Sequence, residues 1–139
     1  SQGALVAALA AHKEKGIKGL ILLAPAFNLP DLAEEYYPKN RQIPDSTDFL
    51  NVMTVGKKYF TEAKGLKPYK NLSKFKGDVL IIHGSSDNLV PVKYATDAAL
   101  EYKSVDMQVL DGIGHSFNGS DGDKMMAIVG EYLDEHKKK

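Results

Sequence analysis

The residues SQGALVAALAA occupy positions 1–11, and GLILLAP occupies positions 19–25. The first stretch begins Ser-x-Gly and continues as a run of small residues with strong helix propensity. The second is continuously apolar, a pattern typical of a strand that is buried on both faces. Together they predict a helix over residues 3–15 that ends at Gly16, followed by a strand over residues 18–24.

The later part of the chain repeats this alternation of strand and helix. Residues 78–84 (DVLIIHG) are a second apolar run, Pro91 opens a helical pattern, and residues 106–110 are a third, shorter strand pattern. A last helical pattern begins at Ser120. Alternating strands and helices favour parallel strands joined by right-handed crossovers. We therefore predict an α/β fold, in which a parallel sheet segment carries helices on both faces.

Residues 26–77 differ from the rest of the chain. They contain four prolines and short amphipathic pieces without a long period. A connection of roughly 50 residues is too long for an ordinary loop. We expect this segment to be an inserted cap or lid, within a chain (1–139) that otherwise forms one domain. Apolar residues at helical spacing predict one helix inside it, over residues 47–63.

Composition excludes several classes of function. The 18 lysine and arginine residues balance the 18 aspartate and glutamate residues, so no net field attracts nucleic acid or an anionic membrane. The absence of cysteine excludes disulfides, thiolate zinc sites and a cysteine nucleophile. No apolar run approaches the ~20 residues of a membrane span. We expect a cytoplasmic bacterial protein, with Lys137-Lys138-Lys139 as a solubilising tail.

The opening Ser1-Gln2-Gly3 matches the downstream half of a nucleophile elbow. In the full pattern, G-x-S-x-G, a strand ends in a tight turn that exposes a serine, and a helix begins directly after it. By itself this signal is weak, because a serine before a helix is commonly only an N-cap. Two motifs far downstream strengthen it.

These motifs stand at the ends of the second and third predicted strands. Asp87 follows the strand over residues 78–84, and His115 follows the strand over residues 106–110. In open α/β sheets, ligands bind at the carboxyl ends of the strands. Ser1, Asp87 and His115 are therefore expected at one edge, in the chain order Ser-Asp-His that distinguishes the α/β-hydrolase triad from other serine-protease orders.

The sequence resembles the C-terminal half of an α/β-hydrolase and is most similar, within that superfamily, to bacterial cinnamoyl/feruloyl esterases. Four stretches carry the resemblance: Ser1-Gln2-Gly3, residues 22–26 (LLAPA), residues 83–91 (HGSSDNLVP) and residues 112–117 (GIGHSF). It covers nearly the whole chain, although residues 26–77 match in length and position better than in residue type.

This resemblance implies a serine carboxylesterase that hydrolyses a small-molecule ester and needs no cofactor and no metal. Ser1 is implied as the nucleophile, His115 as the general base, and Asp87 as the group that orients the imidazole. The main-chain N–H of Gln2 is implied as one oxyanion donor. For Asp87, a turn or helix-cap role is the simpler alternative.

Aromatic residues and one further histidine are weaker candidates. Phe27, Tyr36 and Tyr37 are candidate substrate-binding residues by position, although aromatic residues in a small subdomain more often form its own core. His83 sits beside Gly84 at the end of a predicted strand. There we expect it to pack and to make one hydrogen bond.

The chain departs from the family at its first residue. The strands that precede the nucleophile in the family, together with the loop that supplies the other oxyanion donor, are not in this sequence. We expect these residues alone to have little esterase activity, and the complementary N-terminal segment to restore it. Without that segment the first strand would expose an unpaired edge, which favours pairing with the segment or a homodimer.

Other functional classes stay open at this point. An N-terminal-nucleophile amidohydrolase would also use a leading serine, but those folds stack antiparallel sheets. A serine peptidase of the prolyl-oligopeptidase type and a monoacylglycerol lipase share the expected fold and chemistry. A hydrolase-like domain without catalytic activity is the remaining alternative.

Overall fold

The computed structural model describes residues 1–137, so Lys138 and Lys139 of the basic tail lie outside the described residues. The chain divides into two compact units, one formed by Ser1–Phe27 with Pro68–Lys139 and the other by Asn28–Lys67. The second unit lies within the range in which the sequence predicts an insertion, and its role as a cap stays a prediction. Among residues 1–137, no helix is both long enough and apolar enough to cross a bilayer.

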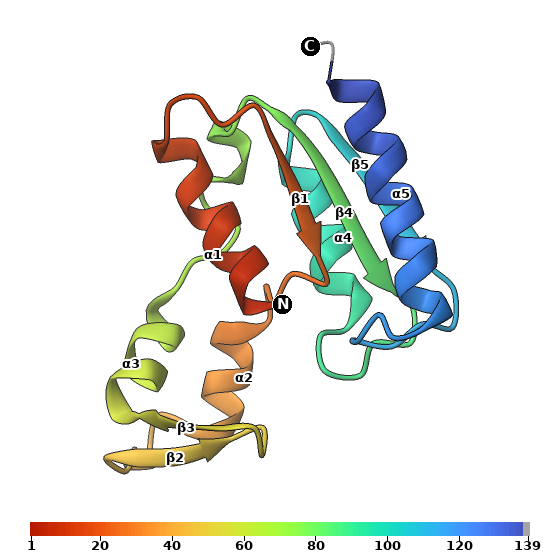
Figure 1. The fold of residues 1–139 in the computed structure, drawn as a ribbon. Helices are drawn as coiled ribbons and strands as arrows, with labels where there is room; N and C mark the ends of the chain where they lie inside the picture. Colours follow the sequence, from red (N-terminus) through yellow and green to blue (C-terminus); the bar gives the residue numbers. More distant parts are fainter. Residues whose placement is uncertain (138–139) are drawn as a thin grey trace. The chain divides into compact units, whose positions relative to one another are not determined.

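The first unit is built on a parallel sheet, which has three strands in the described part of the chain. Strands β1 (Gly19–Leu23), β4 (Asp78–Gly84) and β5 (Val105–Leu110) lie in the order β1-β4-β5 (Figure 1). Both strand pairs are parallel. The three predicted strands are confirmed, each within one residue of its predicted bounds.

Helices cover both faces of this sheet, as the sequence predicts. Figure 1 shows α5 (Ser120–His136) in front of the sheet and α4 (Val92–Glu101) behind it. Tyr132 of α5 packs with Leu80 and Ile82 of the central strand in one apolar cluster. Because β4 is covered on both sides, apolar residues are favoured on both of its faces, which explains the apolar run Val79–Ile82.

Helix α1 (Gln2–Ala10) packs beside β1 and is shorter than the predicted helix. A 3₁₀ helix follows over Ala11–Lys13. Gly16 then adopts φ 96°, a conformation that glycine enters without steric cost. Residues 12–15 are charged or polar, so they gain little from packing, and the regular helix ends before them.

The second unit combines two helices with a hairpin. Its elements are α2 (Leu29–Tyr36), β2 (Ser46–Phe49), β3 (Met53–Gly56) and α3 (Lys57–Gly65), with β2 and β3 antiparallel. A further 3₁₀ helix, Leu72–Lys74, belongs to the first unit.

The predicted helix over residues 47–63 is wrong in its first half, where β2 and β3 form the hairpin. Leu50 and Asn51 at its turn have φ 55° and 56°, in the left-handed region, and the N–H group of Val52 donates a 3.1 Å hydrogen bond to the carbonyl oxygen of Phe49 across them. The two strands carry three β-branched residues, which favour extended backbone. Helical spacing of apolar residues continues through α3, and only that part is helical.

Shortening a buried side chain of the central strand β4 should lower the stability of the fold. Leu80 is 0% exposed, so Leu80→Ala leaves a cavity and should cost about 2–5 kcal/mol of the free energy of unfolding. Leu100→Ala is the matched control, because Leu100 on α4 is 84% exposed and should change stability by less than about 0.5 kcal/mol. Urea unfolding measures both, and equal losses would contradict the central position of β4.

Candidate active site

The carboxyl ends of the parallel strands bring distant segments to one edge of the sheet. β1 ends at Leu23, whose carbonyl oxygen accepts a 2.8 Å hydrogen bond from the amino group of Ser1. Asp87 lies just after β4, and His115 lies shortly after β5. In an open parallel sheet this edge is the usual ligand-binding edge.

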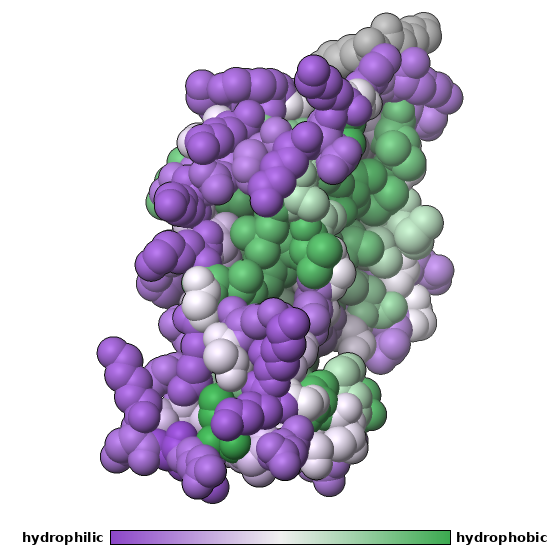
Figure 2. Space-filling view, turned by 90° about the vertical axis from the view of Figure 1, so that its left-hand side faces the viewer, coloured by the Kyte–Doolittle hydropathy of each residue, from purple (hydrophilic) through white to green (hydrophobic). Residues whose placement is uncertain are grey.

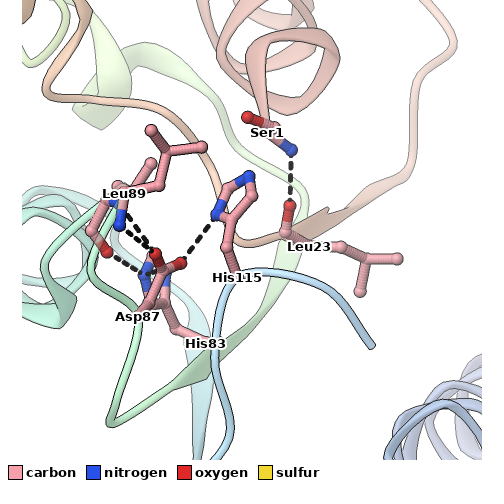
Figure 3. Close-up of polar contacts among 7 residues, drawn as sticks. Ser1, Leu23, His83, Asp87, Leu89 and His115 are labelled. Atoms are coloured by element: carbon pink, nitrogen blue, oxygen red, sulfur yellow. Dashed lines mark hydrogen bonds and ion pairs between the residues drawn. The ribbon is translucent and has the colours of Figure 1, made fainter. Parts of the chain in front are cut away.

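A direct hydrogen bond joins Asp87 and His115. Nδ1 of His115 lies 2.8 Å from Oδ2 of Asp87 (Figure 3). The Asp87 side chain is fully buried, whereas the His115 side chain is 21% exposed. In Figure 3 the His115 ring is drawn between Asp87 and Ser1, with its second nitrogen turned away from the carboxylate. One ring nitrogen is therefore fixed by the acid, and the other is left for proton transfer.

The other carboxylate oxygen of Asp87 is bound by the main chain. Oδ1 accepts hydrogen bonds from the N–H groups of Leu89 at 2.9 Å and Val90 at 2.8 Å. An aspartate that binds N–H groups two and three residues ahead stabilises a turn. Asp87 thus has the turn-forming role that the sequence leaves open, and it pairs with His115 at the same time.

Glycine at the end of β4 allows the acid loop and the histidine loop to meet. A Cβ atom on Gly84 would lie only 2.0 Å from the carbonyl oxygen of Ile113. That carbonyl oxygen accepts a 3.0 Å hydrogen bond from the N–H group of Ser86. The loop that carries His115 is therefore held against the loop that carries Asp87.

Ser1 occupies the N-cap position of α1, but its side chain makes no capping hydrogen bond. Its carbonyl oxygen accepts hydrogen bonds from the N–H groups of Leu5 (3.2 Å) and Ala26 (3.1 Å). Burial lowers the pKa of the Ser1 amino group, and the negative charge of Asp87 opposes this shift. The charge of Asp87 thus reaches Ser1, which agrees with their position at the same edge.

Gln2 is the first residue of α1. The N–H groups of the first helical turn are directed toward the N-terminal end of a helix, where the dipole carries partial positive charge. The main-chain N–H of Gln2 is thus next to the Ser1 hydroxyl in the chain and on the positive end of the helix. Its role as an oxyanion donor stays a prediction.

His83 is fully buried near the end of β4 and has a contact that the sequence does not predict. Its Nε2 lies 2.7 Å from the carbonyl oxygen of Val90 and 3.2 Å from Oδ2 of Asp87. Burial lowers the pKa of His83. The hydrogen bond to Val90 and the charge of Asp87 oppose this shift, whereas the charges of His115 and of the Ser1 amino group add to it. The His-Gly-x-x-Asp spacing is the only sequence signal for the contact with Asp87.

The three predicted aromatic residues are distributed over both units. Phe27 is buried in the first unit, where its ring stacks on Tyr69 with ring centroids 5.3 Å apart. Tyr36 and Tyr37 belong to the second unit, and both rings pack against Phe60. These contacts give each ring a packing role, and a substrate-binding role for the three residues stays a prediction.

An alanine in place of Gly84 should disturb the site more than an alanine in place of Gly114, the residue before His115. Gly84→Ala forces backbone apart, so it should cost about 1–3 kcal/mol of the free energy of unfolding and weaken the Asp87–His115 contact. Gly114→Ala is the matched control, because no atom lies within 4 Å of a Cβ built on Gly114. Urea unfolding and the imidazole NMR spectrum of His115 report the two effects. Equal behaviour of the two variants would contradict the described loop contact.

The stability of the fold should also depend on pH through His83. Its pKa in the fold lies below the ordinary 6.5, so the unfolded chain binds more protons and the free energy of unfolding falls as pH drops below 6.5. His83→Gln removes this titration and leaves Asp87, His115 and the Ser1 amino group unchanged. Urea unfolding at about pH 7.5 and about pH 5.5 should show a smaller acid-induced loss for H83Q than for the wild type. Equal losses would show that His83 does not titrate as described.

No protein-family profile and no curated protein sequence matches the chain. Solved structures do match. Est1E from Butyrivibrio proteoclasticus is similar over 100% of this chain and 60% of its own, with 28% identity and a TM-score of 0.87. A structure of Est1E with ferulic acid bound matches equally well, at a TM-score of 0.87.

More distant structures share the fold. Mouse alpha/beta hydrolase domain-containing protein 10 is similar over 97% of this chain and 60% of its own, with 15% identity and a TM-score of 0.76. A monoacylglycerol lipase from Paleococcus ferrophilus matches over 99% of this chain and 66% of its own, with 17% identity and a TM-score of 0.72. The chain spans about three fifths of the length of Est1E. The chain therefore has the fold of part of an α/β-hydrolase.

Proposed function

We propose that this chain carries the reacting groups of a serine carboxylesterase. The observation that supports the proposal most directly is the 2.8 Å hydrogen bond between His115 and the buried carboxylate of Asp87. Ser1 lies at the same edge of the sheet, and its side chain makes no capping hydrogen bond. The likeness to Est1E and to a named lipase agrees with hydrolase chemistry.

The proposed reaction proceeds through an acyl-enzyme. Oγ of Ser1 attacks the ester carbonyl carbon, and Nε2 of His115 takes the hydroxyl proton. Collapse of the tetrahedral intermediate breaks the bond to the leaving oxygen, and His115 returns the proton to the departing alcohol. Water then attacks the acyl-enzyme, again with His115 as the base, and the carboxylic acid leaves Ser1.

Asp87 supports this sequence through the geometry of His115. Since its Oδ2 binds Nδ1, the proton of neutral imidazole is held at Nδ1, and Nε2 keeps the lone pair that accepts the Ser1 proton. The buried negative charge also stabilises the imidazolium that forms during attack. Two main-chain N–H groups on Oδ1 keep the carboxylate from rotating out of this position.

The main-chain N–H of Gln2 is the proposed donor to the oxyanion on the substrate. Loss of one such donor typically raises the barrier by ~3 kcal/mol. We propose that the second donor is supplied by an N-terminal segment of the hydrolase fold that this sequence does not include.

That same segment is the proposed partner of the free edge of β1. In the described part of the chain, β1 pairs with β4 alone. A groove of about 690 Å³ lies beside the first residues of β1 and β4 and the end of α5, and its lining combines apolar residues such as Leu20, Ile21 and Leu133 with charged ones such as Lys18, Lys76 and Asp134. Figure 2 shows apolar side chains gathered over the surface of the first unit. An extended strand could pair with the edge and cover the groove, whereas a homodimer through the same edge is the competing outcome.

The proposed substrate is an ester of a cinnamic or ferulic acid or of a short acyl group. The Est1E structure with bound ferulic acid supports the aromatic acyl group. The alternatives are a peptide bond and a monoacylglycerol, which need the same triad. Hydrolysis rates on feruloyl, short acyl, monoacylglycerol and peptide substrates separate them, and preference for a peptide would contradict the esterase assignment.

Covalent labelling tests the proposed nucleophile. A fluorophosphonate should attach once per chain, at Ser1, and Ser1→Ala should abolish the labelling. Ser46→Ala is the matched control, because Ser46 is an exposed serine of β2, and it should label like the wild type. Peptide mass spectrometry locates the adduct. An adduct on another residue, or labelling that survives in S1A, would contradict the proposal.

The same assay tests the proposed partner. The chain alone should label slowly and hydrolyse p-nitrophenyl butyrate poorly. Fusion to the N-terminal segment of an α/β-hydrolase should raise both rates, because the segment adds an oxyanion donor and covers the β1 edge. Robust hydrolysis by the chain alone, or a homodimer that is unaffected by the segment, would contradict this part of the proposal.

A further inference from the structure

His83 is a buried titratable group that the proposed reaction does not use. It belongs to the central strand β4, is 0% exposed, and contacts both Val90 and Asp87. A histidine that only fills space in a core needs no contact with a carboxylate. A contact with the proposed catalytic acid therefore needs its own explanation.

The hydrogen bonds of His83 define its protonation state. The carbonyl oxygen of Val90 can only accept, so Nε2 of His83 must carry the proton of the 2.7 Å bond. Nδ1 is buried and has no hydrogen-bond partner among the described residues. A second proton there would be a buried, unpaired charge, which burial disfavours. His83 is therefore neutral, with its single N–H at Nε2.

The same ring nitrogen lies close to the carboxylate. Oδ2 of Asp87 lies 3.2 Å from Nε2 of His83 and 2.8 Å from Nδ1 of His115. One carboxylate oxygen is thus close to a nitrogen of each imidazole ring, and Figure 3 shows its contact with His115. The N–H of His83 donates its hydrogen bond to Val90, and its 3.2 Å separation from Oδ2 makes an additional electrostatic contact with Asp87.

Val90 contacts both His83 and Asp87 through its main chain. The N–H group of Val90 donates to Oδ1 of Asp87 at 2.8 Å, while its carbonyl oxygen accepts from His83. Val90 is itself 2% exposed, so water cannot replace a lost partner at its carbonyl oxygen without rearrangement. Loss of the His83 N–H would therefore loosen the turn over residues 87–90 and remove an electrostatic contact with the carboxylate.

We propose that His83 is a positioning residue of the active site, whose neutral Nε2–H anchors the carbonyl oxygen of Val90 beside Oδ2, so that Asp87 presents a fixed acceptor to His115. The inference rests on the proposed function for its catalytic consequence. The effect of His83 on the positions of Asp87, Val90 and His115 can be measured without any catalytic activity. A role in packing alone predicts that ring volume matters, whereas a positioning role predicts that the N–H donor matters.

Two substitutions separate volume from hydrogen bonding. His83→Phe keeps an aromatic ring and removes the donor, whereas His83→Gln gives up the ring and keeps an N–H near the position of Nε2. His83→Met is a second donor-free variant, whose flexible side chain fits irregular core space if phenylalanine prevents folding. His12→Phe, on the 3₁₀ helix after α1, is the control histidine.

The first measurement uses the chain as it is and needs no activity. Hydrogen exchange of the Leu89 and Val90 amides, which bind Oδ1, should be about tenfold faster in H83F or H83M, as expected for loss of one buried hydrogen bond. The Nδ1–H resonance of His115 should weaken or shift in the same variants. H83Q and H12F should match the wild type in both.

The second measurement uses the chain joined to its N-terminal segment. H83F or H83M should lower kcat by up to about 100-fold, with KM nearly unchanged, because a displaced base affects the chemical step more than binding. H83Q should recover most of kcat. If H83Q is as impaired as H83F, or if the donor-free variants match the wild type in exchange and resonance, the positioning role is wrong. Failure of Ser1 to label would instead reject the proposed function and leave the exchange result as a test of the placement.

Discussion

A buried carboxylate must be surrounded by hydrogen-bond donors, and this constraint organises the active-site edge. Removing a charged group from water costs far more than any one contact returns unless donors replace the water. Asp87 meets this requirement with the amides of Leu89 and Val90 on one oxygen and the ring of His115 on the other, and Nε2 of His83 lies 3.2 Å from that second oxygen. The position of the carboxylate is thereby fixed, and so is the position of His115.

The sheet supplies the convergence that these contacts need. Ser1, Asp87 and His115 lie far apart in the chain. Asp87 and His115 follow the carboxyl ends of β4 and β5, and the amino group of Ser1 donates to the carbonyl oxygen of Leu23 at the end of β1. The loops that carry Asp87 and His115 can approach closely only because Gly84 has no side chain. Leu80 in the core and Gly84 beside the His115 loop both belong to β4. The packing of this strand and the position of the His115 imidazole therefore depend on each other.

Much of this arrangement can be predicted from the sequence, because buried parallel strands need unbroken apolar runs and because the His-Gly-x-x-Asp motif follows such a run. The hairpin over residues 46–56 could not be predicted in this way. Its turn uses Leu50 and Asn51 at positive φ without a glycine, and its apolar residues are also compatible with helical spacing. The contact between His83 and Asp87 depends on how the chain turns after β4, which residue spacing alone does not define.

The central claim is that Asp87 activates the hydroxyl of Ser1 only through His115. The most direct test is the rate constant for fluorophosphonate labelling of Ser1 in Asp87→Asn, His115→Ala and the double variant, each joined to the N-terminal segment. Each single substitution should slow labelling by about 10³-fold or more, and the double variant should be no slower than H115A. Effects that multiply, or labelling that is indifferent to His115, would contradict the account.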